Sequence, residues 1–264
     1  MFPGLSTPIK GGIAITYRDS GREFTPIQAF TQFPEVNAIV QKVTGRDDFV
    51  SLTEIVFSRT SYRLTDVMHK ENPTAIAKLS TGHAYDMSSN ILQRLPEIFF
   101  DEEPDDGNDY IRVIGRDKNR RIYKYIRREY VNKVANLDAY KLYVAQANGS
   151  GAFGDTMSPP VVEGPGVGAT ETFISIGNFQ TKEEAFHLEK YVKSKFARTL
   201  LSVLKVTQNG NKPVWRMIPL QDFTSASDID WTVSIPEIDR QLYAKYGLDD
   251  AEIAFIESHV KEML

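Results

Sequence analysis

The residues best suited to chemistry in this sequence are amide side chains in the polar turn "TQNGNK", which follows a run rich in lysine and arginine. The amides of Gln208 and Asn209 can pair with the donor and acceptor of adenine in the major groove of DNA. Thr207 and Asn211 add further polar groups, and Gly210 leaves room for a close approach. The same turn could instead be a helix C-cap that uses Gly210.

A second candidate is the stretch "GSGAFG" at residues 149–154, which follows an expected strand and has the G-x-G-x-x-G spacing of dinucleotide-binding loops. In those loops the last glycine opens a helix whose N-terminus holds the phosphate. Here Pro159-Pro160 would stop that helix almost at once. The stretch is better explained as a loop that gives some other partner access to its backbone, so we predict no cofactor-binding residue in it.

Catalytic motifs are absent from the sequence. Cysteine is absent, and the four histidines (69, 83, 187 and 259) show no i, i+4 pairing, which argues against a zinc site. Neither Asp-x-Lys nor Glu-x-Lys, the element of restriction-type nucleases that hold magnesium, occurs in the chain. The closest match to the [N/D]-P-P-[Y/F] loop of adenine methyltransferases is "NPTA" at Asn72, which lacks the second proline and the aromatic residue. We therefore predict no catalytic and no metal-binding residue.

The elements that must position these residues predict an α+β fold, in which a twisted, mostly antiparallel sheet packs against one long helix and a small C-terminal helical tail. A short helix is expected over "PEVNAIVQKVTG", and "YIRVIGRDKNRRIYKYI" predicts a hairpin with the polar tip "RDKNR". Alternating apolar residues predict strands near Ile13, over 140–146, over 170–177 and over "VWRMIPL".

The long helix is expected over residues 181–206. Thr181 and Glu184 form a capping box at its start, and an apolar stripe continues to Val206. Its other face would offer cations to a partner, namely Lys190, Lys193, Arg198 and Lys205. The tail is expected to form two helices, "PEIDRQLYAKYG" and "DDAEIAFIESHVKEML".

Charge is segregated along the chain, whose formal net charge is −4. Residues 112–133 contain nine Lys/Arg and two acids, whereas residues 222–264 contain ten acids and three bases. This pattern is typical of a protein whose basic middle part binds a polyanion while its acidic tail faces away from that polyanion. Alternatively, the basic hairpin could simply pair with its own acidic loop at 101–109. The lack of cysteine fits the cytoplasm, and no apolar run is long enough for a membrane helix, so no membrane contact is expected.

Three stretches resemble the C-terminal target-recognition region of fused restriction-modification enzymes, the N6-adenine methyltransferases of types IIG and ISP. They run over residues 140–162, from "ATETFISIGNFQ" to "LLSVLKVTQ", and from "IPLQDFTSASDIDWT" to "DDAEIAFIE". The strand-helix-turn-strand order is also similar to the specificity domains of type I systems. The N-terminal "FPGLSTPIKGGIAITYRD" looks like the last strands of a methyltransferase domain.

This resemblance implies that the chain recognises double-stranded DNA for a methyltransferase domain or subunit, which would carry the S-adenosylmethionine. Residues 1–45 would end that domain or form a connector, 46–223 would be the target-recognition domain, and 224–264 a helical tail that faces a partner protein. A free-standing nuclease with an unorthodox centre and a purely structural interaction module are the alternatives. The residues expected to contact DNA are Arg59, Tyr62, Arg63, Arg116, Lys118, Arg120, Arg121, Asn148, Ser150, Lys205, Thr207 and Gln208.

Overall fold

The structure is a computed structural model that describes residues 18–21 and 29–263. The strand expected near Ile13 lies outside these residues. Within them the fold is α+β with mostly antiparallel sheets, as predicted. No helix in the described part of the chain is long and apolar enough to cross a membrane.

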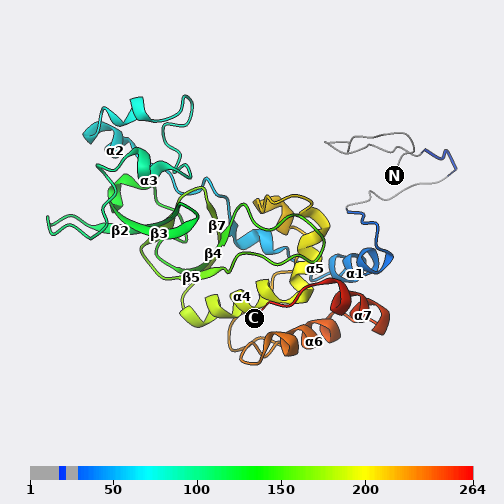
Figure 1. The fold of residues 1–264 in the computed structure, drawn as a ribbon. Coiled ribbons are helices and arrows are strands. Elements are labelled where there is room, and N and C mark those ends of the chain that lie inside the picture. The colour runs from blue at the N-terminus through cyan, green and yellow to red at the C-terminus, as the bar shows by residue number, and fades with distance from the viewer. Residues whose placement is uncertain (1–17, 22–28, 264) are drawn as a thin grey trace.

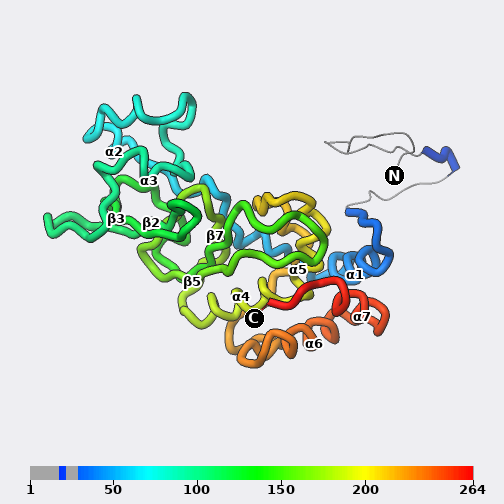
Figure 2. The backbone as a smooth tube through the Cα atoms, in the orientation of Figure 1, coloured from blue at the N-terminus to red at the C-terminus, as the bar shows by residue number. Residues whose placement is uncertain are grey.

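The chain builds two lobes, each around its own hydrophobic core (Figures 1 and 2). The larger lobe contains most of the helices and a four-stranded sheet. The smaller lobe is formed mainly by residues 58–139, drawn from cyan to green in Figure 2, and contains a three-stranded sheet. The predicted boundaries at 45 and 223 do not follow these cores, because helices from all three predicted regions share the larger one.

The sheet of the larger lobe has the strand order β1-β7-β4-β5, with every neighbouring pair antiparallel. Leu142 lies opposite Ile176 in its centre, and both are fully buried. Helix α4 packs across β4, β5 and β7. The strands are β1 (Val56–Phe57), β4 (Tyr140–Ala145), β5 (Val161–Glu163) and β7 (Phe173–Phe179).

The sheet of the smaller lobe has the order β3-β2-β6. β2 (Tyr110–Asp117) and β3 (Arg120–Arg127) form the predicted hairpin. β6 (Val167–Ala169) pairs parallel to β2, although it lies in the chain between two strands of the larger lobe. Short helices α2 (Asp66–Glu71) and α3 (Ile91–Arg94) cover this lobe (Figure 1).

The helices of the larger lobe lie mainly on its side away from the smaller lobe, where they pack together (Figure 1). The predicted first helix and the two predicted tail helices are confirmed. The strand expected over "VWRMIPL" is wrong, because a 3-10 helix spans Lys212–Trp215 and no strand follows it. The remaining helices are α1 (Pro34–Thr44), α4 (Lys182–Lys193), α5 (Lys195–Leu204), α6 (Ile235–Lys245) and α7 (Asp250–His259).

The single long helix expected over 181–206 is broken at Ser194 into α4 and α5. The hydroxyl of Ser194 accepts from the backbone N–H of Ala197, so it caps α5. The carboxylate of Asp239, from α6, accepts from the N–H groups of Lys195 (3.0 Å) and Phe196 (2.8 Å). These bonds satisfy the N–H groups that a new helix start leaves free, which allows the chain to turn there.

A buried polar network joins the two sheets. The hydroxyl of Tyr62 donates to Asn136 Oδ1 (2.9 Å) and lies 2.9 Å from the hydroxyl of Tyr143. Asn136 Nδ2 donates in turn to Ser175 on β7 (3.0 Å). The hydroxyl of Tyr143, on β4, also lies 2.8 Å from the carbonyl of Val167 on β6, a strand of the other sheet. Burial raises the pKa of Tyr62 to about 12, so its hydroxyl stays protonated and able to donate.

We expect Tyr62→Phe to lower the free energy of unfolding by about 1–2 kcal/mol, because it leaves a buried Asn136 oxygen without its donor. Tyr140→Phe is the control, since its half-buried hydroxyl makes no hydrogen bond within the described residues. Urea denaturation of the three proteins measures the difference. Equal midpoints for the two variants would contradict a stabilising network.

Candidate nucleic-acid interface

The tip of the β2-β3 hairpin presents exposed cations of the basic segment. Asp117 pairs with Arg120, so the turn has two residues, Lys118 and Asn119, in place of the five-residue tip that was expected. Both turn residues have positive φ (46° and 63°), as tight hairpin turns require. Lys118 and Arg120 are exposed, and no ion pair is found for either within the described residues.

Two arginines face each other just below this tip. Arg116 and Arg121 are direct cross-strand partners, and like charges in such a position are unfavourable without a counter-ion. Arg121 donates to the carbonyl of Pro159 (2.8 Å) and lies over the ring of Phe173. Its guanidinium therefore holds the hairpin against the larger lobe, and Arg116 is the freer of the two.

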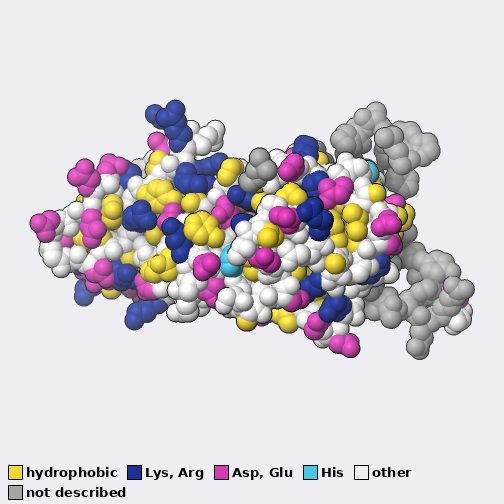
Figure 3. Space-filling view, turned by 90° about the horizontal axis from the view of Figure 1, so that it is seen from below, with side chains coloured by type: hydrophobic (Ala, Val, Ile, Leu, Met, Phe, Trp, Pro, Cys, Tyr) yellow, Lys and Arg dark blue, Asp and Glu magenta, His cyan; other side chains and the backbone are white. Residues whose placement is uncertain are grey.

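The remaining cations of the hairpin are largely paired with acids of the chain. Lys124 contacts Asp101 (2.5 Å) and Arg128 contacts Asp109 (2.6 Å), both at the ends of the acidic loop 101–109. Arg112 and Arg127 pair with Glu163 and Glu71. Figure 3 shows basic and acidic side chains interspersed over this end of the molecule. The alternative of internal pairing thus holds for the base of the hairpin, whereas Lys118 and Arg120 at the tip have no ion pair within the described residues.

The stretch "SRTSYR" offers fewer unpaired, exposed side chains for DNA contact than the sequence predicted. Tyr62 is only 2 % exposed and lies in the network described above, so the prediction that it contacts DNA is wrong. Arg59 and Arg63 are exposed, but they pair with Glu171 (3.2 Å) and Asp86 (3.5 Å). Exposed pairs of this kind are weak, so both arginines can exchange partners with little loss.

The cations expected on the long helix are used inside the protein. Lys190 Nζ donates to the carbonyls of Trp231 (2.8 Å) and Val233 (2.9 Å), where it fixes the following loop. Arg198 is 2 % exposed and donates from Nε to the carbonyl of Lys193, at the end of α4. The expectation that this helix face offers charge to a partner is therefore wrong.

Two loops of the larger lobe are joined by hydrogen bonds into one surface, which we call the loop platform (residues 146–151 and 205–211). The N–H of Asn148 donates to the carbonyl of Gln208 (2.8 Å), and the N–H of Gly210 donates to the carbonyl of Gln146 (2.7 Å). Lys205 Nζ donates to the carbonyl of Asn148 (2.6 Å), and burial lowers the pKa of Lys205 below its ordinary value.

The side chains on this platform divide into internal and available ones. Asn148 is 5 % exposed and its Oδ1 accepts from the N–H of Ser158, so it shapes the loop and the prediction that it contacts DNA is wrong. Ser150 is exposed but binds Asp155, and hydrogen bonds from Ser150 and Lys261 hold the pKa of that carboxyl well below its usual range. Thr207 and Gln208 are exposed, as predicted for contact residues.

The glycines of the loop are explained by packing on the chain itself. A Cβ on Gly151 would lie 2.6 Å from Thr207 Cα, and one on Gly154 would lie 2.3 Å from the carbonyl oxygen of His259. Both glycines have positive φ. No helix follows Gly154, so the loop lacks the phosphate cradle of a dinucleotide site.

Contacts connect the platform to the other candidate segments. The carbonyl of Thr172, the residue before β7, accepts from the N–H of Gln146, and the neighbouring Glu171 pairs with Arg59. Ser158, held by Asn148, precedes the proline that accepts from Arg121. The structure thus links the four predicted segments through a short series of contacts. Sequence reasoning missed Gln146, whose only signal is its place directly after a strand, at the start of the glycine-rich loop.

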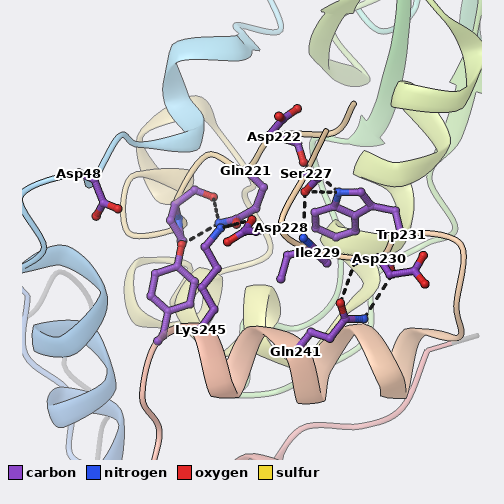
Figure 4. Close-up of polar contacts among 12 residues, drawn as sticks. Asp48, Gln221, Asp222, Ser227, Asp228, Ile229, Asp230, Trp231, Gln241 and Lys245 are labelled. Atoms are coloured by element: carbon purple, nitrogen blue, oxygen red, sulfur yellow. Dashed lines mark hydrogen bonds and ion pairs between the residues drawn. The ribbon is translucent and has the colours of Figure 1, made fainter. Parts of the chain in front are cut away.

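The acidic tail forms a different surface, far from the hairpin in Figure 1. Figure 4 shows its loop held by internal bonds: Trp231 Nε1 donates to the Asp222 carbonyl and to Ser227, and Lys245 pairs with Asp228 (2.7 Å). Beside it lies an open groove of about 650 Å³ whose lining carries the carboxylates of Glu183, Glu184, Asp228 and Asp230. Carboxylates repel phosphate, which favours the hairpin side for a polyanion.

Among the described residues, no group of three or more His, Asp or Glu side chains is placed to hold a metal ion. Comparison of the chain with models of protein families, with curated proteins and with solved structures gives no match.

Proposed function

We propose that this chain binds double-stranded DNA by sequence and positions a separate N6-adenine methyltransferase domain or subunit on it, in the cytoplasm. The observation that carries the proposal is the loop platform, which holds exposed amide and hydroxyl groups on a backbone fixed by hydrogen bonds from both loops. Base edges are read by polar groups held in such fixed positions.

The hairpin tip supplies the second part of the proposal. Lys118 and Arg120 are free to contact phosphates, which would set the position of the platform on the duplex. Arg121 links the hairpin to the loop that leads from the platform, so the two contact regions are connected. The partner domain would bind S-adenosylmethionine and carry out the methyl transfer.

Binding of a fluorescent random-sequence duplex tests this function directly. We expect the affinity to fall steeply between about 50 and about 200 mM salt, because phosphate contacts release counter-ions. Absence of binding at the lowest salt would overturn the proposal. It would favour a structural interaction module, a function consistent with the internal pairing of most hairpin cations.

We predict that Gln208→Ala reduces methylation of the proper site by roughly tenfold to a hundredfold when the methyltransferase domain is supplied, since a bidentate amide contact contributes about 1–3 kcal/mol. The amide of Gln208 is exposed and makes no hydrogen bond to the rest of the described chain. Gln41→Ala, on the exposed face of α1, is the matched control.

The readout is methylation of a library with a randomised site. Binding to random duplexes should change little, because that affinity depends on lysine and arginine. A Gln208→Ala protein that methylates the same sites as the wild type would show that this amide does not read a base.

A further inference from the structure

Three amide side chains connect the two loops of the platform. Gln146 Nε2 donates to Asn211 Oδ1 (3.0 Å) and to Asn209 Oδ1 (3.3 Å). The backbone of Gln146 is itself fixed, since its N–H donates to the Thr172 carbonyl (2.8 Å) and its carbonyl accepts from Gly210 (2.7 Å). Gln146 is half-buried, whereas Asn209 and Asn211 are exposed. The half-buried amide thus orients the two exposed ones.

This orientation determines which groups the turn offers to a partner. An asparagine amide has one carbonyl oxygen and an NH₂ group with two donors. The oxygens of Asn209 and Asn211 point to Gln146, and their NH₂ groups have no acceptor within the described residues. A bidentate contact with adenine needs the oxygen and the NH₂ of one amide to face the base together. The NH₂ groups of Asn209 and Asn211 are therefore the groups left without a hydrogen bond, and each oxygen keeps only the lone pair that Gln146 does not use. Gln208 keeps both its oxygen and its NH₂ free.

We propose that Gln146 is a positioning residue that sets Asn209 and Asn211 to read hydrogen-bond acceptors in the major groove. Guanine offers two acceptors there, N7 and O6, and thymine offers O4. Adenine also offers N7, but beside the N6 donor, which opposes a second N–H group. Base pairs next to the one read by Gln208 are then selected for guanine or thymine on the strand that faces the turn. This inference rests on the proposed DNA recognition and assigns a specificity to one part of the platform.

The discriminating variant is Gln146→Glu, which has nearly the same size but only accepts hydrogen bonds. The link between the loops survives if Asn209 and Asn211 turn their NH₂ groups to the glutamate, and their oxygens then face outward. Oxygens accept from adenine N6 and cytosine N4. A purely structural link would keep its function in this variant and leave the preferred bases unchanged.

The experiment selects bound duplexes from a randomised library and sequences them, with wild type, Gln146→Glu and Gln146→Leu. We expect guanine or thymine to be favoured about five- to tenfold at the affected positions in the wild type, adenine or cytosine in Gln146→Glu, and little preference in Gln146→Leu. The Gln208-dependent position should stay the same in all three. Thermal melting checks that each variant is folded. If the Gln146→Leu protein does not fold, the comparison of wild type with Gln146→Glu is sufficient to test the inference.

Failure of the inference is distinct from failure of the proposed function. If the wild type selects a site and the Gln146→Glu protein selects the same one, the inference is overturned while DNA recognition stands. A wild-type site that has only adenine or cytosine beside the Gln208-dependent base would also overturn the inference and leave DNA recognition standing. If the wild type binds no duplex, both are overturned.

Discussion

Replacing Lys118 and Arg120 together with glutamate is expected to weaken binding to any DNA duplex by roughly tenfold to a hundredfold near 0.1 M salt, because two phosphate contacts and their released counter-ions are lost. The slope of log affinity against log salt should become shallower by about two. Arg121 is left in place, since its guanidinium also holds the hairpin against the carbonyl of Pro159.

The control carries the same change of charge on two helices of the larger lobe. Lys182 on α4 and Arg240 on α6 are exposed, and their replacement by glutamate should leave affinity and slope close to those of the wild type. Fluorescence anisotropy over a series of salt concentrations measures both quantities. If the two double variants behave alike, the hairpin tip is only a solvated turn.

The largest effect on stability is expected for Asp239→Ala, which should lower the free energy of unfolding by about 2–4 kcal/mol. Asp239 is 2 % exposed, and its carboxylate is the acceptor for two N–H groups at the start of α5. Alanine leaves both groups without an acceptor in a buried position. Asp47→Ala, at an exposed aspartate without a hydrogen bond in the described structure, is the control for urea denaturation.

The pH dependence gives a second test of Asp239. Burial raises the pKa of its carboxyl from 3.8 to about 6, so between these values the folded protein binds more protons than the unfolded chain. The contribution of Asp239 to stability therefore declines as the pH rises from about 4 to about 6. The stability difference between wild type and Asp239→Ala should be larger at about pH 4 than at about pH 7. A difference that grows with pH would contradict the raised pKa.

The parts of the fold that were predictable depend on short-range signals. The capping boxes at Thr181 and Asp249 form as their spacing indicates, and the hairpin follows from two alternating runs around a polar turn. The break at Ser194 was not predictable, because the apolar stripe continues through it and part of its stabilisation comes from Asp239, 45 residues further along the chain. The strand expected over "VWRMIPL" failed because Trp215 is held by a hydrogen bond to Gly210, within a 3-10 turn.

The exposure of the candidate residues could be predicted for some of them and not for others. Charge and turn chemistry indicated the hairpin tip and Gln208, which are exposed. The same reasoning selected Tyr62 and Arg198, which are buried, because composition does not show which polar groups meet partners inside the fold. Gln146 was missed for the converse reason: its role depends on two asparagines more than 60 residues away.

The position of β6 has a consequence for synthesis of the protein on the ribosome. Residues 58–139 leave the ribosome before residues 140–264, but the sheet of their lobe is completed only by Val167–Ala169. Those residues follow β4 and β5, which belong to the other sheet. The hairpin can therefore form early, while its inner edge stays uncovered until the chain has been made through Ala169. The smaller lobe thus cannot finish folding on its own ahead of the larger one, and both complete their sheets late in translation.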